Sequence, residues 1–428
     1  MNKDIIILGG GLTGLSAAYH GGGFIYEKEG AVGGTCASPK ADGFIFDLGI
    51  HVLHTKDKYV LDLLINKLNC KIHIIKRSAW IYSSGVMTKY PFQVNTFGLP
   101  AGVKKDCIDG FRDACGKMDR RKKYRDYEEW VYGKFGKGIA EHFYLPYSEK
   151  FWTVPAKEMT MDWVDVRVPL PKLEDVIEGS SRLYEKEYGP NATFRYPLNA
   201  GISKIPEAFL PKISNRVFLN KKAVCLSLKN KVITFEDGPI AGYKSLIATI
   251  PVPELFRIIK DNVPSKVIDA VRGLRCNSIL CVNLGVGKSS IHKSHWIYYP
   301  EKDYSFFRIS FPKNFCNNLA PSNKSSITAE IAYSGRINKQ DMTNKVVKDL
   351  IRAKILKKKG EIELIDVRDV KYGYPIYDHN RNANMKIISS YLKRFDVFLA
   401  GRYGKWEYQW MHDAVLDGKR VAKEVRQR

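Results

Sequence analysis

The first forty residues constrain the fold of this chain more than any other stretch. Residues 4–8 (DIIIL) are typical of a short buried strand, and they run directly into glycines at positions 9, 11 and 14. Residues 15–19 then favour a helix, and 24–26 a second strand that ends on Glu27. Strand, glycine turn, helix, strand and acid, in this order, are the pattern of a dinucleotide-binding βαβ unit. The sequence therefore predicts an α/β chain with a Rossmann-like domain at its start.

Each part of the glycine turn has a physical role in holding a pyrophosphate. Gly9 permits the tight turn, Gly11 lets phosphates approach the backbone, and Gly14 lets the helix pack closely on the strand. Leu12 and Thr13 open the helix, whose N-terminus offers amide donors and a partial positive charge. Three glycines in succession then predict that this helix is short.

Glu27 and a second pair of glycines indicate which dinucleotide to expect. A carboxylate at this point accepts hydrogen bonds from ribose hydroxyls, which favours FAD or NAD over NADP. Lys28 follows, and then the run Gly33-Gly34-Thr35. An acid followed closely by a glycine doublet is typical of flavoproteins with two dinucleotide-binding motifs, because the doublet gives the backbone a second close approach to the pyrophosphate. We therefore expect FAD, bound by the turn, by Glu27 and Lys28, and by the doublet with Thr35.

Composition narrows the class of protein further. The chain has 428 residues, 44% of them hydrophobic, so it can bury large cores and hold two or three domains. No window approaches the roughly 18 apolar residues of a membrane span. The first strand begins almost at once, so we expect no leader peptide and a cytoplasmic protein. Eight scattered cysteines, without a Cys-x-x-Cys motif or a Cys/His cluster, argue against a metal site and fit a reducing compartment.

The net charge of +24 is large and is spread along the whole chain. Lysine-rich faces in contact with solvent are the simplest interpretation. A basic protein could instead bind nucleic acid or an anionic membrane, or steer an anionic small substrate into a cleft. The motifs below favour the last of these, so no nucleic acid is expected as a partner.

The order of predicted elements divides the chain into three parts, one of them discontinuous. These are a FAD-binding domain (1–78, 196–252 and 390–428), a helical domain (96–150) and a mostly antiparallel sheet domain that carries the substrate (79–95, 151–195 and 253–389). We expect the substrate cleft to lie between the parts. A closing helix that starts near Asp413 would direct its N-terminus at the flavin, where a positive dipole stabilises negative charge.

Motifs along the whole chain resemble those of the UDP-galactopyranose mutase family. Residues 49–55 (GIHVLHT) are similar to the G-x-H-x-x-H-T loop of its bacterial members. Further segments, closer to the eukaryotic members, follow in family order: 90–93 (YPFQ), 146–155 (PYSEKFWTVP), 163–168 (WVDVRV), 295–300 (HWIYYP) with 307–308 (FR), 374–376 (YPI) and 401–408 (GRYGKWEY). Together these motifs are far more specific than the dinucleotide fingerprint, which the amine oxidases share.

The resemblance implies a redox-neutral flavoenzyme, an intramolecular transferase that interconverts pyranose and furanose forms of a UDP-sugar. In that family the flavin must be reduced. Its N5 attacks the anomeric carbon and expels UDP, and the resulting flavin–sugar iminium lets the sugar ring open and close again. Such chemistry needs no side-chain nucleophile, but the leaving diphosphate is dianionic and must be met by cations.

The resemblance assigns catalytic roles to two arginines and a histidine. Arg167 and Arg308 would meet the diphosphate, because a guanidinium offers phosphate a two-pronged contact. A salt bridge at the surface or between domains is the alternative for each arginine. His51, by its family position, would lie beside the flavin and respond to its redox state, whereas a lone histidine is more often a satisfied core residue.

Aromatic and amide side chains complete the site that the resemblance implies. The tyrosines at 298, 374 and 408 would donate hydroxyls to phosphates, residues 90–93 would border and read uracil, and Trp152 would border the sugar. Packing in a core is the alternative in each case. The expected substrate-binding residues are Tyr90, Phe92, Gln93, Trp152, Trp296, Tyr298, Tyr374 and Tyr408. Further cofactor contacts are expected from Gly49, Val224, Gly401, Arg402, Met411 and Asp413.

Departures from the family pattern leave the sugar open. Ser148 stands where the pattern has Asn, Ile50 where it has Gly or Pro, and Phe307 and Phe315 where tyrosines are expected. These positions affect the sugar pocket and the flavin loop more than the nucleotide site. Galactose, another hexose, an N-acetylhexosamine or a different nucleotide carrier all remain possible.

Two other functions stay open. An amine-oxidase-like flavin oxidase or desaturase would share the N-terminal motifs, have an apolar or aromatic substrate site and consume oxygen. A non-catalytic basic flavoprotein would bind nucleic acid or membrane with strong salt dependence. NAD(P)H is a possible reductant, although no second fingerprint for it occurs, and the sequence does not fix the oligomeric state.

Overall fold

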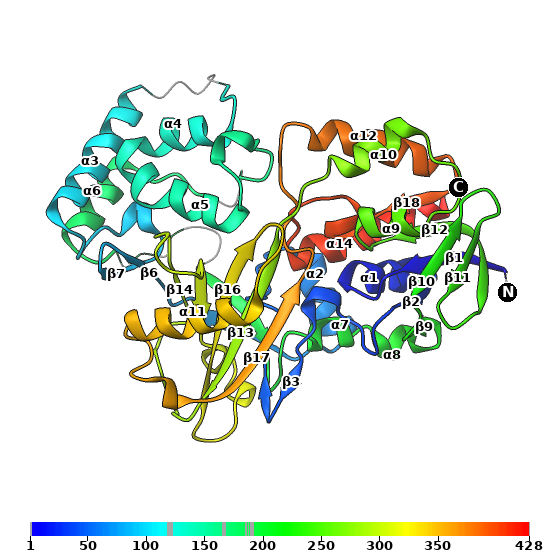
Figure 1. The fold of residues 1–428 in the computed structure, drawn as a ribbon, viewed down its shortest axis with the longest axis horizontal. Coiled ribbons are helices and arrows are strands. Elements are labelled where there is room, and N and C mark those ends of the chain that lie inside the picture. Colours follow the sequence, from blue (N-terminus) through cyan, green and yellow to red (C-terminus); the bar gives the residue numbers. More distant parts are fainter. Residues whose placement is uncertain are drawn as a thin grey trace.

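The computed structural model describes residues 2–427 except 118–122, 165–167, 185, 187 and 189–191. Arg167 lies outside these described residues, so its role stays a prediction. The chain forms two seven-stranded sheets, one in each half of the molecule, and both termini lie in the half built on the first sheet (Figure 1).

The first sheet has the N-terminal strand at its centre. β1 (Asn2–Leu8) pairs in parallel with β2 (Phe24–Tyr26) on one side and with β12 (Ile240–Ala248) on the other. The strand order is β10-β11-β12-β1-β2-β9, with β18 also paired in parallel to β12. The remaining bounds are β9 (Val217–Phe218), β10 (Ala223–Ser227), β11 (Val232–Phe235) and β18 (Val397–Leu399). The expected α/β architecture, with a Rossmann-like unit assembled from distant segments, is thereby confirmed.

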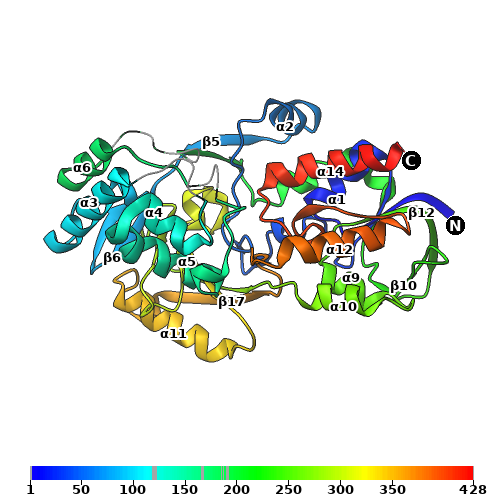
Figure 2. The same cartoon turned by 90° about the horizontal axis from the view of Figure 1, so that it is seen from above.

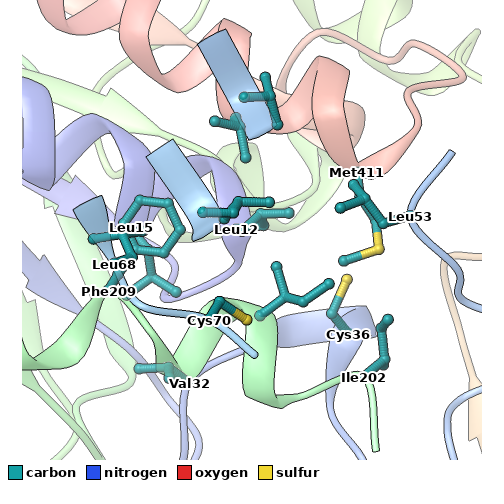
Figure 3. Packing of buried hydrophobic residues seen from close by; sticks show 14 of the residues in the cluster. Leu12, Leu15, Val32, Cys36, Leu53, Leu68, Cys70, Ile202, Phe209 and Met411 are labelled. Carbon is teal, nitrogen blue, oxygen red and sulfur yellow. The ribbon is translucent and has the colours of Figure 1, made fainter. Parts of the chain in front are cut away.

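Helices cover both faces of this sheet, because alternate residues of β1 point to opposite sides. Ile7 packs toward α1 (Leu12–Gly21) and α14 (Met411–Arg426), which lie side by side (Figure 2). Figure 3 shows the core on this face, with Leu12, Leu15 and Met411. Ile6 packs into the opposite core, under three further helices. These are α9 (Val252–Ile258), α10 (Ser265–Arg272) and α12 (Arg381–Lys393).

Glycines permit the close packing of α1. The helix has ten residues and ends at Gly22, whose φ is +83°, so the prediction of a short first helix is confirmed. A Cβ on Gly418 of α14 would lie 2.5 Å from the carbonyl oxygen of Thr13. The two helices therefore approach more closely than a side chain at position 418 would allow.

The second sheet is mostly antiparallel, in the order β17-β13-β16-β15-β14-β6-β7. Only the β14–β6 pairing in it is parallel. Its bounds are β6 (Ala79–Ser83), β7 (Val86–Lys89), β13 (Ser278–Val286), β14 (Trp296–Tyr298), β15 (Arg308–Ser310), β16 (Ser325–Tyr333) and β17 (Ile362–Val370). One face packs on α11 (Lys339–Arg352), which contributes Val346 and Leu350 to a shared core.

A group of helices lies beyond this sheet and shares a core with its other face (Figures 1 and 2). Gly136 and Gly110 let two of these helices touch, since a Cβ on Gly136 would lie 1.9 Å from the Gly110 carbonyl oxygen. The group contains α3 (Ala101–Gly116), α4 (Tyr127–Ile139), α5 (Leu145–Trp152) and α6 (Leu173–Ser181). The exact boundaries of the three predicted domains stay a prediction.

Short elements connect these parts. The small strands form two pairs, β3 (Lys40–Ala41) with β4 (Phe44–Ile45) and β5 (Ile72–Lys76) with β8 (Thr193–Pro197). The short helices are α2 (Lys58–Asp62), α7 (Lys204–Glu207), α8 (Leu210–Ile213) and α13 (Gly401–Gly404). Among the described residues, no helix combines the length and the apolar character that crossing a membrane requires.

Candidate functional site

The glycine turn between β1 and α1 has the geometry that phosphates need. Gly9 has φ +105°, and its N–H donates to the Tyr26 carbonyl at 3.0 Å. A Cβ on Gly14 would lie 2.1 Å from the Gly9 carbonyl oxygen, which excludes any other residue there. A Cβ on Gly11, in contrast, would meet no atom within 4 Å, so this stretch of backbone faces open space. The α1 N-terminus beside it has no side-chain cap, which leaves its amides free to bind an anion.

Glu27 closes the turn at the end of β2. Its side chain accepts the N–H of Gly10 at 2.6 Å and that of Glu29 at 2.9 Å, and the residue is only 7% exposed. A carboxylate fixed in this way still has acceptor capacity for ribose hydroxyls. The side chain of Lys28 is exposed and pairs with Glu29 at 3.1 Å.

The glycine doublet lies directly against the first turn, as predicted. Gly33 has φ +123° and donates to the Gly10 carbonyl at 2.9 Å. Gly34, with φ +56°, is so close that its Cβ would lie 3.4 Å from Cα of Gly11. Thr35 follows in a short 3₁₀ turn. Two glycine-rich backbones therefore line one anion site.

The C-terminal segment contributes a third glycine turn to the same place. Gly401 has φ +78°, and a Cβ on it would lie 2.8 Å from Oγ1 of Thr13. Its N–H donates to the buried carboxylate of Asp417 at 2.7 Å. The α14 N-terminus begins at Met411, where Asp413 accepts the N–H of Trp410 at 2.8 Å. Asp417 was not predicted from the sequence, because only the fold brings α14 beside the 401 turn.

Arg402 is a cation that lacks an acidic partner within the described part of the chain. Its guanidinium donates to the Gln409 carbonyl at 2.6 Å and faces the rings of Tyr374 and Tyr408, at 5.3 and 5.8 Å from their centroids. In the same region Nδ1 of His51 and Oε1 of Gln409 are buried without a hydrogen-bond partner in the described chain. A charged group and unpaired polar atoms of this kind fit a bound anionic group with polar edges, such as FAD or a nucleotide.

Val224 occupies an irregular place in β10. The register of β10 against β11 shifts between Ala223 and Cys225, so Val224 is the bulged residue. A bulged residue is left out of the ladder, and its backbone groups can bind something else. The segment before it meets the acid of the turn, since Lys221 N–H donates to the Glu27 carbonyl at 2.8 Å. This placement is compatible with the expected cofactor contact, which stays a prediction.

His51 is neutral at physiological pH in this environment. Burial, reinforced by the positive charges of Arg402 and Arg308, lowers its pKa to about 3. The loop that carries it bends at Gly49, whose φ is +77°. The structure places His51 close to Arg402 and Arg308, and the expected position beside the flavin stays a prediction.

Arg308 is held rigidly by an acid that was not predicted. Nε and one terminal nitrogen donate to the two oxygens of Glu330, each at 2.7 Å, and the two side chains are 12% and 2% exposed. They face each other because Arg308 of β15 is in register with Glu330 of β16. Glu330 also abuts the loop that carries His51, since a Cβ on Gly49 would lie 2.6 Å from Oε2. An acid within an otherwise uncharged strand, SSITAEIAY, was the available signal.

Aromatic side chains from five segments meet around these cations. Tyr90 contacts Tyr298 with ring centroids 5.0 Å apart. Trp152 contacts Tyr374 at 6.0 Å and Tyr408 at 5.6 Å, and these two tyrosines are 5.5 Å apart. We call Tyr90, Trp152, Tyr298, Tyr374 and Tyr408 the aromatic wall. The fold thus brings together five of the eight expected substrate residues.

Arg77 adds a cation to one end of the aromatic wall. Its guanidinium lies 4.7 Å from the ring centroid of Tyr90. Sequence reasoning missed it, because its segment between β5 and β6 carries no motif that we recognised.

The other three expected substrate residues lie outside the aromatic wall. Phe92 is completely buried and stacks on Phe143 at 5.1 Å, so its ring has no exposed face for a base in this structure. Trp296 is 4% exposed and stacks on Phe315 at 6.1 Å. For both residues, core packing describes the observed geometry.

Gln93 is also buried, but it keeps an unused acceptor. Its Nε2 donates to the Pro169 carbonyl at 3.2 Å, whereas Oε1 has no partner in the described chain. Ser148, the residue that departs from the family pattern, shares a hydrogen bond with the Tyr127 hydroxyl at 3.1 Å.

A cavity of about 690 Å³ opens beside Tyr408. This volume is in the range of small-molecule sites. Tyr408 belongs both to the cavity and to the aromatic wall, so the two are contiguous. Other lining residues include Arg381, Gln409, Asp413 and Arg420.

Comparisons with known proteins agree with this arrangement. Residues 7–66 match the NAD(P)-binding Rossmann-like domain, and residues 133–426 match the flavin-containing amine oxidoreductases. A crystal structure of reduced UDP-galactopyranose mutase is similar over 100% of this chain and 94% of its own, at 26% identity and a TM-score of 0.91.

Two other solved structures share the fold at lower identity. A putrescine oxidase bound to putrescine is 15% identical, covers 100% of both chains and has a TM-score of 0.68. A fatty acid isomerase from P. acnes is 12% identical, with a TM-score of 0.68, and the match covers 99% of this chain and 98% of that one.

Proposed function

Since the chain belongs to the flavin-containing amine oxidoreductase family, we propose that it is a FAD-dependent mutase that interconverts the pyranose and furanose forms of a UDP-sugar. The observation that carries the proposal is the pairing of cations with tyrosines in one place. Arg308 and Arg402 lie at a wall of tyrosine hydroxyls, which suits a dianionic diphosphate. An amine substrate, itself a cation at neutral pH, would be repelled there by Arg402, which has no acidic partner in the described chain, whereas Arg308 is paired with Glu330. The likeness to reduced UDP-galactopyranose mutase over the full chain gives independent support.

The residues that would hold FAD are those of the three glycine turns. The turn at 9–14 and the doublet at 33–34 would hold the pyrophosphate, and Glu27 the ribose. Arg402 and the α14 N-terminus would stabilise negative charge on the ring system. When bound and reduced, the flavin would supply the nucleophile for the anomeric carbon of the sugar.

Side chains around the diphosphate would bind and orient the substrate. Arg308 is fixed by Glu330 in two hydrogen bonds, so its free N–H groups have a defined direction and lose little entropy on binding a phosphate. The hydroxyls of Tyr298, Tyr374 and Tyr408 would donate to phosphate oxygens, and Trp152 would exclude water from the sugar side. His51, being neutral, can exchange a hydrogen bond without adding a charge.

The proposal also covers the substrate, a second diphosphate ligand and the electron donor. A nucleotide sugar is the expected partner, with UDP-galactose as the first candidate. Arg167 is proposed as a second diphosphate ligand. NAD(P)H is proposed as the reductant, because the active form of such an enzyme requires a reduced flavin.

Anaerobic turnover is the decisive experiment. Dithionite-reduced, FAD-loaded protein is incubated with UDP-galactofuranose, and the products are separated by chromatography, with the oxidised protein as control. We expect UDP-galactopyranose from the reduced protein alone. Absence of conversion together with tight UDP binding would move the substrate to another UDP-sugar. Absence of UDP binding, with oxygen uptake on addition of an amine, would replace the mutase by the oxidase that the family also contains.

A further inference from the structure

Helix α5 connects the helical group to the site, because its C-terminal turn carries Trp152 of the aromatic wall. The helix lies where the helical group meets the second sheet (Figure 1). It ends at Thr153, whose φ is +63°. The last carbonyls of any helix have no partner within the helix and must find one elsewhere. The position of Trp152 therefore depends on the groups that donate hydrogen bonds to the last carbonyls of α5.

Lys150 joins this turn to the segment that follows β14. Its ammonium donates to the carbonyl of Tyr299 at 2.9 Å and to that of Glu301 at 2.7 Å. Tyr298 of the aromatic wall is the residue immediately before this segment. A side-chain amine that donates to two backbone carbonyls sets the separation of the two segments, since these hydrogen bonds hold only within a few tenths of an ångström.

Asn277 joins the C-terminal turn of α5 to the segment that contains Tyr374. It is completely buried, and its Nδ2 donates to the carbonyl of Phe151 at 2.7 Å. Its Oδ1 accepts the N–H of Tyr374 at 2.8 Å. One side chain thus caps the end of α5 and at the same time holds the backbone of a wall tyrosine.

We propose that Lys150 and Asn277 are positioning residues that clamp the C-terminal turn of α5 between the 299–301 segment and Tyr374, and so fix Trp152 in the aromatic wall. The contacts of Trp152 with Tyr374 and Tyr408 follow from this clamp. The hydrogen bonds of Lys150 and Asn277 given above do not involve Arg308 or Arg402. Both residues therefore act through the helix they hold. The clamp itself is independent of the reaction, whereas its kinetic consequence rests on the proposed function.

Hydrogen exchange of backbone amides tests the clamp without any assay of activity. The variants are K150M and N277A, each in FAD-loaded protein, with K150R as the conservative rescue. Two matched controls are K293M, which changes an exposed lysine just before β14, and N283A, which changes an asparagine equally buried in β13 but bonded to Asp366 and Thr328.

We expect amides of 145–153 to exchange at least about tenfold faster in K150M and N277A, because opening α5 no longer breaks these bonds. Amides of α14 should be unchanged, K150R should restore protection, and both controls should leave α5 as in the parent. Unchanged exchange of 145–153 in K150M and N277A would overturn the proposal. Failure of both variants to fold, while N283A and K293M fold, would also overturn it, since the residues would then serve the whole fold.

Kinetics provide the second readout. In both clamp variants we expect kcat for the mutase reaction to fall by about tenfold or more, with the Kd for UDP within about threefold of the parent, because the sugar side is displaced and the phosphate cations are not. Equal losses in UDP binding and kcat would contradict a role confined to α5. If the parent protein shows no mutase activity, the proposed function fails while the exchange experiment still decides on the clamp.

Discussion

At the residue scale, the pair of Arg308 and Glu330 shows how a strand register creates a site. The two side chains meet only because β15 and β16 align these positions, and each oxygen of the acid receives one N–H. A buried pair of this kind adds little to stability by itself, but it leaves an arginine with a fixed orientation.

Substitution of Arg308 by lysine keeps the charge and removes the planar fork. We expect kcat/KM for the UDP-sugar to fall by roughly 30- to 1,000-fold, or about 2–4 kcal/mol of transition-state stabilisation. The control is R336K, which changes an exposed arginine. Steady-state kinetics under anaerobic reducing conditions measure both, and parental kcat/KM in R308K would remove Arg308 from the proposed mechanism.

Asp47 makes stability depend on pH in an unusual direction for an acid. Burial raises the pKa of its carboxyl from 3.8 to about 6, although hydrogen bonds from Ser38 and Tyr196 oppose the shift. Between these two values the folded protein binds a proton that the unfolded chain does not. The free energy of unfolding therefore falls as pH rises through this window, by about 3 kcal/mol in total.

Denaturant unfolding at about pH 4 and about pH 7 measures this effect. We expect the D47N variant to lose less stability between these two pH values than the parent does, by about 2 kcal/mol. A parent and a variant with the same pH dependence would show that Asp47 does not titrate in this range.

At the element scale, the position of α1 depends on the absence of a side chain at Gly14, and an unusual backbone conformation of this glycine is not the reason. Gly14 and Gly102 are both helical glycines, but a Cβ on Gly14 would lie 2.1 Å from the Gly9 carbonyl oxygen, while one on Gly102 would meet nothing within 4 Å. We expect G14A to displace α1 from the turn at a cost of about 1–3 kcal/mol and to lose most bound FAD.

The matched variant G102A should keep its FAD and gain slightly in stability, because alanine favours a helix. Absorbance of the flavin in purified protein, relative to protein concentration, measures retention. Equal FAD content in the two variants would show that the close approach of α1 to the turn is not needed for the cofactor.

The sequence predicted the features whose residues lie close together along the chain. The glycine turn, the acid and the doublet follow one another within forty residues, and they contact one another directly. Glu330, Asp417 and Asn277 could not be predicted, because their partners come from strands or helices aligned only in the fold. The sequence equally could not distinguish Phe92, which is in a core, from Tyr374, which belongs to the aromatic wall, since an aromatic residue is suited to both places.

At the scale of the whole molecule, the charge of +24 acts on association rather than on the fold. We expect the Kd for UDP to rise well beyond what two arginine contacts explain when salt increases from about 50 to about 300 mM. Isothermal titration measures the change, and binding of uncharged uridine is the control. A flat response of the UDP affinity would leave the excess of lysines as a feature of the solvated surface only.

The central position of β1 in the first sheet has a consequence for synthesis. β12 lies beside it from the middle of the chain, and β18 and α14 complete the sheet and its helical cover from the last residues. A ribosome releases these pieces in order, so the helical cover of the first strand is complete only when nearly the entire polypeptide has emerged. Contacts so distant along the chain also close slowly. We infer that a nascent chain cannot retain FAD before release, and that the segment most exposed to chaperones is the one that carries the dinucleotide fingerprint.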